Sequence, residues 1–140
     1  DHRDLHSFPT RRSSDLTGGR MQMDFKTSLH ELDDGYWSSV SEVPNLVVFN
    51  MSYFFLNVDC TFTENLADRI VSVMRKYPLN RYVFIIQHSD HDTKIRSFLV
   101  FKNMLEQYVE TIKAERSTFC YELGGNPKIL PFCYEIWKSK

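Results

Sequence analysis

The residues best placed to bind a ligand are Asn50, Ser52 and Tyr53, the first polar side chains at the carboxyl end of the longest apolar run in the chain. Gln87 and His88 end a second, shorter apolar run in the same way. In open parallel α/β sheets, ligands bind outside the carboxyl ends of the strands. We therefore expect a functional site where the two runs end, with Gln87 and His88 as substrate contacts. The alternative is that these polar groups only cap the strand ends.

The polar stretch that begins at Gln87 also contains residue types of two other kinds of site. His88, Ser89 and Asp90 are the types of a hydrolytic triad, but consecutive residues cannot line up as nucleophile, base and orienting group. His88 and the acidic and histidine side chains at 90–92 are metal-ligand types, but no closing ligand is evident elsewhere in the chain. We therefore expect a solvated loop here and no metal site.

The longest apolar run, Pro44–Leu56, is rich in β-branched and aromatic residues and opens with a turn-forming Pro-Asn pair. Such a run predicts a strand at about Leu46–Phe54 that is buried on both faces. Strands of this kind belong to parallel sheets that helices cover on each side. Tyr82–Gln87 is a second, shorter run of the same character.

Two helices follow these strands. The first is predicted to begin at the capping-box sequence Thr61–Glu64 and to end at Pro78. Its apolar residues recur at helical spacing on one stripe, which consists of Leu66, Ile70, Val73, Met74 and Tyr77. The second helix is predicted over about Thr93–Lys113.

The last part of the chain alternates apolar and polar residues in two segments, Thr118–Leu123 and Leu130–Trp137. A cluster of turn residues that contains Gly124 and Gly125 separates them, so we expect an antiparallel hairpin. The predicted fold class is α/β. It is a partial three-layer, Rossmann-like sheet in which helical crossovers join parallel strands and an antiparallel hairpin ends the chain.

This element order, together with the sequence PNLVVFNMSYFF at the first strand, resembles the C-terminal half of a class I S-adenosylmethionine-dependent methyltransferase. In that family the sheet ends with strand 4, helix, strand 5, helix, and strands 6 and 7 as a hairpin that inserts an antiparallel strand. The resemblance covers residues 24–140, with Leu46–Phe54 as strand 4 and Tyr82–Gln87 as strand 5. The glycine-rich loop and the acidic residue that hold the cofactor in this family would lie upstream.

The resemblance implies roles for the candidate residues. Asn50, Ser52 and Tyr53 would be catalytic, since they match the family's fourth motif, and methyl transfer depends mainly on positioning. S-adenosylmethionine would be the cofactor, and an unknown methyl acceptor would contact Gln87 and His88. The residues expected to touch the cofactor are Thr27, Ser28, Asn50 and Met51. A second hypothesis is a non-enzymatic α/β interaction module that begins at Met21 or Met23.

The first residues, Asp1–Leu16, resemble a translated short-read sequencing adapter residue for residue. Such segments are set aside in fold reasoning, so we expect a non-native, disordered segment here. Residues 17–140 would then be the C-terminal part of a single methyltransferase-like domain, and this fragment alone would be inactive. Without strand 1 of the family, Leu46–Phe54 would be an exposed apolar edge through which chains self-associate.

The composition sets further bounds. The 17 basic and 18 acidic residues give a net charge of −1, so there is no strong nucleic-acid signal. No apolar run approaches the roughly 18 residues of a membrane-spanning helix. The odd number of cysteines, Cys60, Cys120 and Cys133, favours a reducing, cytoplasmic location.

Overall fold

The computed structural model describes residues 33–40, 44–89 and 96–140. The chain divides into two compact units, Asp1–Trp37 and Ser38–Lys140, and the sheet belongs to the second. Helix α1 (Asp34–Val40) starts after Asp33, whose carboxylate accepts a hydrogen bond from the Tyr36 amide at 2.8 Å. The predictions for Asp1–Leu16 and for Thr27 and Ser28 lie outside the described residues.

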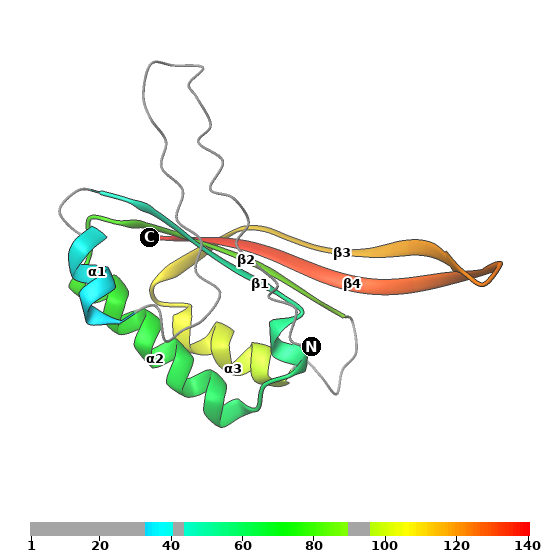
Figure 1. The fold of residues 1–140 in the computed structure, drawn as a ribbon, viewed down its shortest axis with the longest axis horizontal. Coiled ribbons are helices and arrows are strands. Elements are labelled where there is room, and N and C mark those ends of the chain that lie inside the picture. Colours follow the sequence, from blue (N-terminus) through cyan, green and yellow to red (C-terminus); the bar gives the residue numbers. More distant parts are fainter. Residues whose placement is uncertain (1–32, 41–43, 90–95) are drawn as a thin grey trace, which may run out of the picture. The chain divides into compact units, whose positions relative to one another are not determined.

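The four strands of the second unit form one mixed sheet in the order β1-β2-β4-β3 (Figure 1). They are β1 (Leu46–Ser52), β2 (Arg81–Ser89), β3 (Val109–Leu123) and β4 (Asn126–Ser139). β1 and β2 run parallel, whereas β4 is antiparallel to both β2 and β3. The predicted α/β class, the parallel pair with a helical crossover and the terminal antiparallel hairpin are confirmed.

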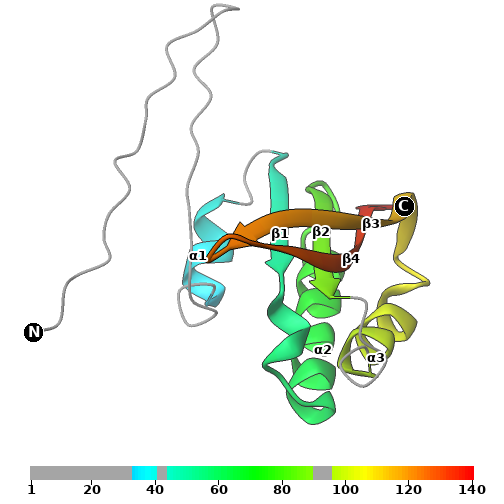
Figure 2. The same ribbon diagram turned by 90° about the vertical axis from the view of Figure 1, so that its right-hand side faces the viewer.

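Helices α2 (Cys60–Lys76) and α3 (Arg96–Leu105) cover the same face of this sheet (Figure 2). We call it the helical face, and we call the opposite one the open face. Residues of β1 alternate between the two, and Leu46 and Val48 on the open face are 65% and 49% exposed. The prediction that this strand is buried on both faces is therefore wrong, because in the described part of the unit α2 and α3 cover only one side.

The beginning of α2 differs from the predicted capping box. Asp59 is the N-cap residue, and its carboxylate accepts a hydrogen bond from the Phe62 amide at 2.7 Å. The Thr63 hydroxyl donates to the Asp59 carbonyl at 2.8 Å, so this threonine lies inside the first turn. Asp is as good an N-cap residue as Ser and better than Thr, which explains why the helix begins before Thr61. The predicted apolar stripe is confirmed in its main members, and Leu66, Ile70 and Met74 are buried.

Helix α3 ends at Leu105, well before the predicted Lys113. The Tyr108 amide donates to the Leu105 carbonyl at 2.8 Å in the turn that follows. β3 then begins at Val109, which pairs with Ser139. The segment after Tyr108 contains β-branched residues and pairs with β4, with one register shift between Thr111 and Lys113. This long-range pairing overrides its local helical pattern.

The hairpin of β3 and β4 turns at Gly124 and Gly125, whose φ angles are +60° and +78°. Two successive left-handed residues make the two-residue turn that matches the twist of a hairpin, and glycine adopts them without strain. β4 pairs with β2 only over Phe132–Lys138. The remaining part, Thr118–Leu123 with Asn126–Pro131, is a two-stranded ribbon that extends beyond α2 and α3 (Figure 1).

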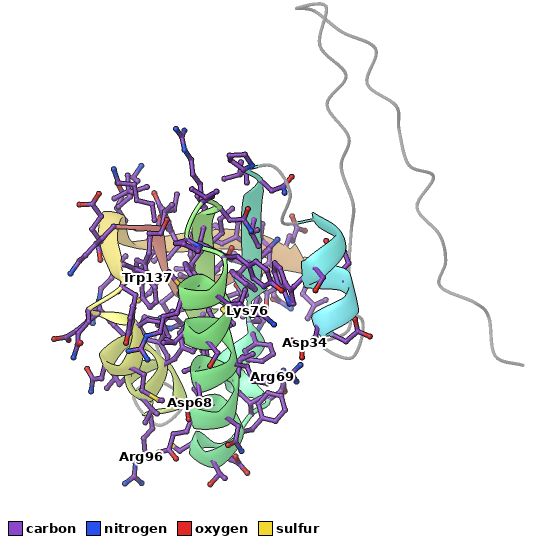
Figure 3. All side chains as sticks on the ribbon, turned by 90° about the vertical axis from the view of Figure 1, so that its left-hand side faces the viewer. Asp34, Asp68, Arg69, Lys76, Arg96 and Trp137 are labelled. Atoms are coloured by element: carbon purple, nitrogen blue, oxygen red, sulfur yellow. The ribbon has the colours of Figure 1, made fainter. Side chains whose placement is uncertain are left out.

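The core is an aromatic cluster between the helical face and the helices. Trp137 of β4 lies there (Figure 3), and it is 1% exposed. Its ring centroid is 5.9 Å from Phe98 and 6.0 Å from Phe101 of α3, and 6.1 Å from Phe84 of β2. Phe55, which follows β1, packs on Phe101 at 5.1 Å. Aromatic pairs at such spacings stabilise a core beyond the effect of their buried area, so this cluster fixes β2, β4 and α3 together.

Candidate functional site

The carboxyl ends of β1 and β2 lie side by side, as the sequence predicts for a parallel pair. Ser52 is in register with Gln87. The backbone amide of Tyr53 donates to the Gln87 carbonyl at 2.5 Å, and the Gln87 side-chain Nε2 donates to the Tyr53 hydroxyl at 3.2 Å. Two hydrogen bonds thus join the residue after β1 to the end of β2. We call Asn50, Ser52, Tyr53 and Gln87 the strand-end cluster.

Tyr53 has a left-handed backbone, with φ 56° and ψ 15°. It is the one non-glycine residue with a positive φ in the described ranges. A residue held in this region costs on the order of 1–3 kcal/mol and persists only where its surroundings fix it. The two bonds to Gln87 supply that constraint, and the Tyr53 carbonyl also accepts from Asn57 Nδ2 at 3.5 Å. Strain of this kind concentrates at functional sites, so Tyr53 is the strongest geometric marker of this cluster.

Asn50 and Ser52 project from the open face beside Gln87. The Ser52 hydroxyl donates to Asn50 Oδ1 at 2.8 Å, and both residues are exposed. This contact orients the amide of Asn50 so that its Nδ2 hydrogens can donate to a ligand. The structure therefore brings together the three predicted catalytic residues and one predicted substrate contact on a single surface.

Met51 and His88, which we predicted beside them, project from the helical face instead. They are 6% and 3% exposed, because side chains alternate across each strand. Neither can meet a ligand on the open face through its side chain. The prediction grouped them with the others because it considered their position along the strand but not the alternation of side chains between the two faces.

The other candidate residues contribute less. Ser89 is buried at the end of β2, whereas Asp90, His91 and Asp92 lie outside the described residues, as do Thr27 and Ser28. Within the described ranges, no group of three or more His, Cys, Asp or Glu side chains is arranged to hold a metal ion.

The strand-end cluster offers two side-chain amides and two hydroxyl groups. These neutral groups can donate hydrogen bonds to, and accept them from, the polar atoms of a ligand. The cluster contains no carboxylate.

No protein-family model matches the chain, and no curated protein matches its sequence. Among the described residues, no helix has both the length and the apolar composition that a bilayer crossing requires.

Proposed function

We propose that this chain is the C-terminal portion of a Rossmann-like methyltransferase that moves a methyl group from S-adenosylmethionine to an acceptor still to be identified. The observation that supports it most is the place of β4, which lies between β2 and β3 and is antiparallel to both. The class I methyltransferase sheet ends with a hairpin that inserts an antiparallel strand in this manner.

The strand order is informative because a simpler arrangement of the strands was also possible. After α3, β3 could have paired directly with β2 and left β4 at the edge. Instead β4 is inserted, so β3 runs in the same direction as β1 and β2. Both α2 and α3 are then crossovers between parallel strands, which is the repeating unit of a doubly wound sheet.

The strand-end cluster gives the proposal its chemistry. S-adenosylmethionine, when bound, supplies a methyl group on a positively charged sulfur. The amide of Asn50 would orient the acceptor. The ring of Tyr53, whose hydroxyl accepts a hydrogen bond from Gln87, would lie beside the methyl group. This is catalysis by positioning, in which a correctly oriented pair of reactants gains much of the rate enhancement. Thr27 and Ser28 remain predicted neighbours of the cofactor's adenine.

The open face supports the idea that further chain completes the domain. Leu46 and Val48 of β1 and Ile85 of β2 are large apolar side chains that are strongly exposed there. In a doubly wound sheet, a second helical layer covers this face. We accordingly expect this fragment to self-associate through β1 when it is expressed alone.

The odd number of cysteines favours a reducing compartment, so we propose that the complete enzyme is cytoplasmic.

The genomic sequence upstream of Thr17 tests the proposal. We expect the reading frame to continue upstream into a strand, a glycine-rich turn and a helix, with an Asp or Glu roughly 20 residues further on. An in-frame stop codon a short way upstream of Thr17 would overturn the proposal and favour the interaction module instead.

A further inference from the structure

The outer edge of β3 is a border of the sheet, and no strand of the described residues lies beside it. β3 has 15 residues, and every one after Val109 is exposed. Its last part belongs to the ribbon that extends beyond α2 and α3 (Figure 1). A strand edge presents unpaired N–H and C=O groups to which another strand can bind, so proteins protect such edges with proline, charges or a covering segment. The two edges of the ribbon differ in this protection.

The β4 edge of the ribbon carries two prolines. Pro127 is in register with Glu122, and Pro131 is in register with Thr118. Because proline has no N–H, it occupies a strand where its nitrogen faces away from the neighbouring strand. In an antiparallel ladder, pairs that exchange both hydrogen bonds alternate with pairs that exchange none. The two proline pairs are of the second kind, so the N–H and C=O groups of Thr118 and Glu122 point out of the β3 edge.

The segment of β3 between Arg116 and Glu122 has no such protection. Its sequence is Ser-Thr-Phe-Cys-Tyr, which contains no proline, glycine or charged residue. Phe119 and Tyr121 are 56% and 41% exposed, and their ring centroids lie 6.1 Å apart with 18° between the planes. An edge of this composition, with backbone groups that point outward, is typical of a strand that pairs with another chain.

The charges at the two ends of this segment indicate which chain that is. In an antiparallel pair of identical strands, a two-fold axis at Phe119 sets Arg116 of each copy opposite Glu122 of the other. Opposite charges that face each other across two strands stabilise the pairing. An axis one residue away, at Thr118 or at Cys120, sets each of these charges opposite an uncharged residue. The charges of β3 therefore complement a second copy of β3 when the axis lies at Phe119.

The same register brings aromatic side chains together. The backbone groups of Phe119 point toward β4, because those of its neighbour Thr118 point outward. The Phe119 residues of two copies would thus form a non-hydrogen-bonded pair, in which side chains approach most closely. Each would be diagonal to Tyr121 of the other copy, at about 7–8 Å, which is within reach of aromatic side chains. Pairing would therefore cover rings that are exposed in a single chain.

We propose that β3 pairs with β3 of a second copy of this chain, antiparallel about a two-fold axis at Phe119. The pairing runs from Glu115 to Leu123 in each copy and joins the two four-stranded sheets into one. Because both copies use the same surface, the contact closes at a dimer. It lies at the border of the sheet opposite β1 and does not involve the strand-end cluster, so it does not depend on the proposed function.

Cysteine cross-linking of the full chain in a Cys120→Ser background tests the register. Phe119→Cys sets two thiols at the axis, with about 4.5 Å between the Cα atoms, which a disulfide can bridge. Tyr121→Cys is the matched control, because Tyr121 would lie opposite Ser117 and its two copies would be roughly 13 Å apart along the strands. All of these positions are exposed, so the variants should keep the fold.

Under mild oxidation, we expect Phe119→Cys to form a linked dimer at least about tenfold faster than Tyr121→Cys, with the linked peptide identified by mass spectrometry. Two copies of Cys120 in the unaltered chain would be diagonal neighbours at about 8 Å, too far apart to link. Equal rates for Phe119→Cys and Tyr121→Cys would mean random collision and would overturn the proposal. Rapid linkage through Cys120 would overturn the axis at Phe119.

A charge exchange sharpens the test, with the cross-linking rate of Phe119→Cys as the readout because it reports contact through β3 and not through β1. Glu122→Arg sets like charges opposite each other and should slow the cross-linking several-fold. Adding Arg116→Glu restores opposite charges and should restore the rate. Glu106→Arg makes the same change of charge outside β3 and should leave the rate unchanged. If Glu106→Arg slows the reaction as much as Glu122→Arg, or the double variant is not restored, the pairing is wrong.

Discussion

The two faces of the sheet carry apolar side chains from the same strands, yet among the described residues α2 and α3 pack on only one of them. On the helical face, Phe84, Ile86 and Trp137 are at most 1% exposed. On the open face, Leu46 and Val48 are 65% and 49% exposed. Composition does not separate the two sets, because both are made of large apolar residues. The difference is the cover that α2 and α3 provide on the helical face, whereas the same residue types form an exposed apolar surface on the open face.

Two neighbouring residues on β2 test most directly whether the two faces differ in packing. Ile86 is fully buried on the helical face, and Ile85 is 39% exposed on the open face. Ile86→Thr should lower the free energy of unfolding by about 2–4 kcal/mol, because it removes packing and buries a hydroxyl.

Ile85→Thr should change it by less than about 1 kcal/mol, since threonine suits an exposed strand position. Urea denaturation of both variants measures the difference. Equal losses would mean that the open face is covered as well as the helical face.

A second prediction concerns the backbone of Tyr53, where β1 leaves the sheet. Its left-handed conformation suits asparagine but not a β-branched residue. Tyr53→Val should therefore be about 1–2 kcal/mol less stable than Tyr53→Asn in the same urea assay. Both variants lose the hydroxyl that Gln87 binds, so the difference between their free energies of unfolding reports the cost of the left-handed backbone conformation. If the two are equally stable, Tyr53 does not hold a strained conformation.

The smallest expected effect lies at the surface, between β3 and β4. The hydrogen bond from the Tyr134 hydroxyl, and then that from Lys113, hold the pKa of Glu115 below its ordinary value. A lowered folded-state pKa means that this carboxylate stabilises the fold above its unfolded pKa, and the effect is lost as pH falls through the folded pKa.

Tyr134→Phe should raise the pKa of Glu115 toward the ordinary value, and an NMR titration of the side-chain carboxyl carbon measures it. Lys128→Gln serves as the control and should leave the pKa in place. An unchanged pKa in Tyr134→Phe would mean that the tyrosine hydroxyl does not bind this carboxylate.

The sequence predicts the order of the four strands and of α2 and α3, because each of these elements has a local signal, but it does not predict α1. β1 and β2 are short apolar runs, α2 has a clear apolar stripe, and Gly124-Gly125 allows a hairpin turn. The boundary between α3 and β3 could not be predicted in this way. Residues 106–113 combine helix-forming and β-branched types, and the pairing of residues 109–113 with a strand roughly 25 residues later decides the outcome.

The position of the strand-end cluster could be predicted from the sequence, but its geometry could not. A parallel pair brings Asn50, Ser52 and Gln87 to one edge of the sheet, which follows from chain order. The left-handed turn at Tyr53 has no local signal, because neither glycine nor asparagine occupies that position.

Equilibrium binding of methyl-labelled S-adenosylmethionine, compared between this chain and the product of the reading frame extended upstream, tests the central claim most directly. We predict saturable binding by the extended protein, weakened by Tyr53→Val, and little binding by this chain alone. An extended protein that folds around the same sheet but does not bind S-adenosylmethionine would contradict the account.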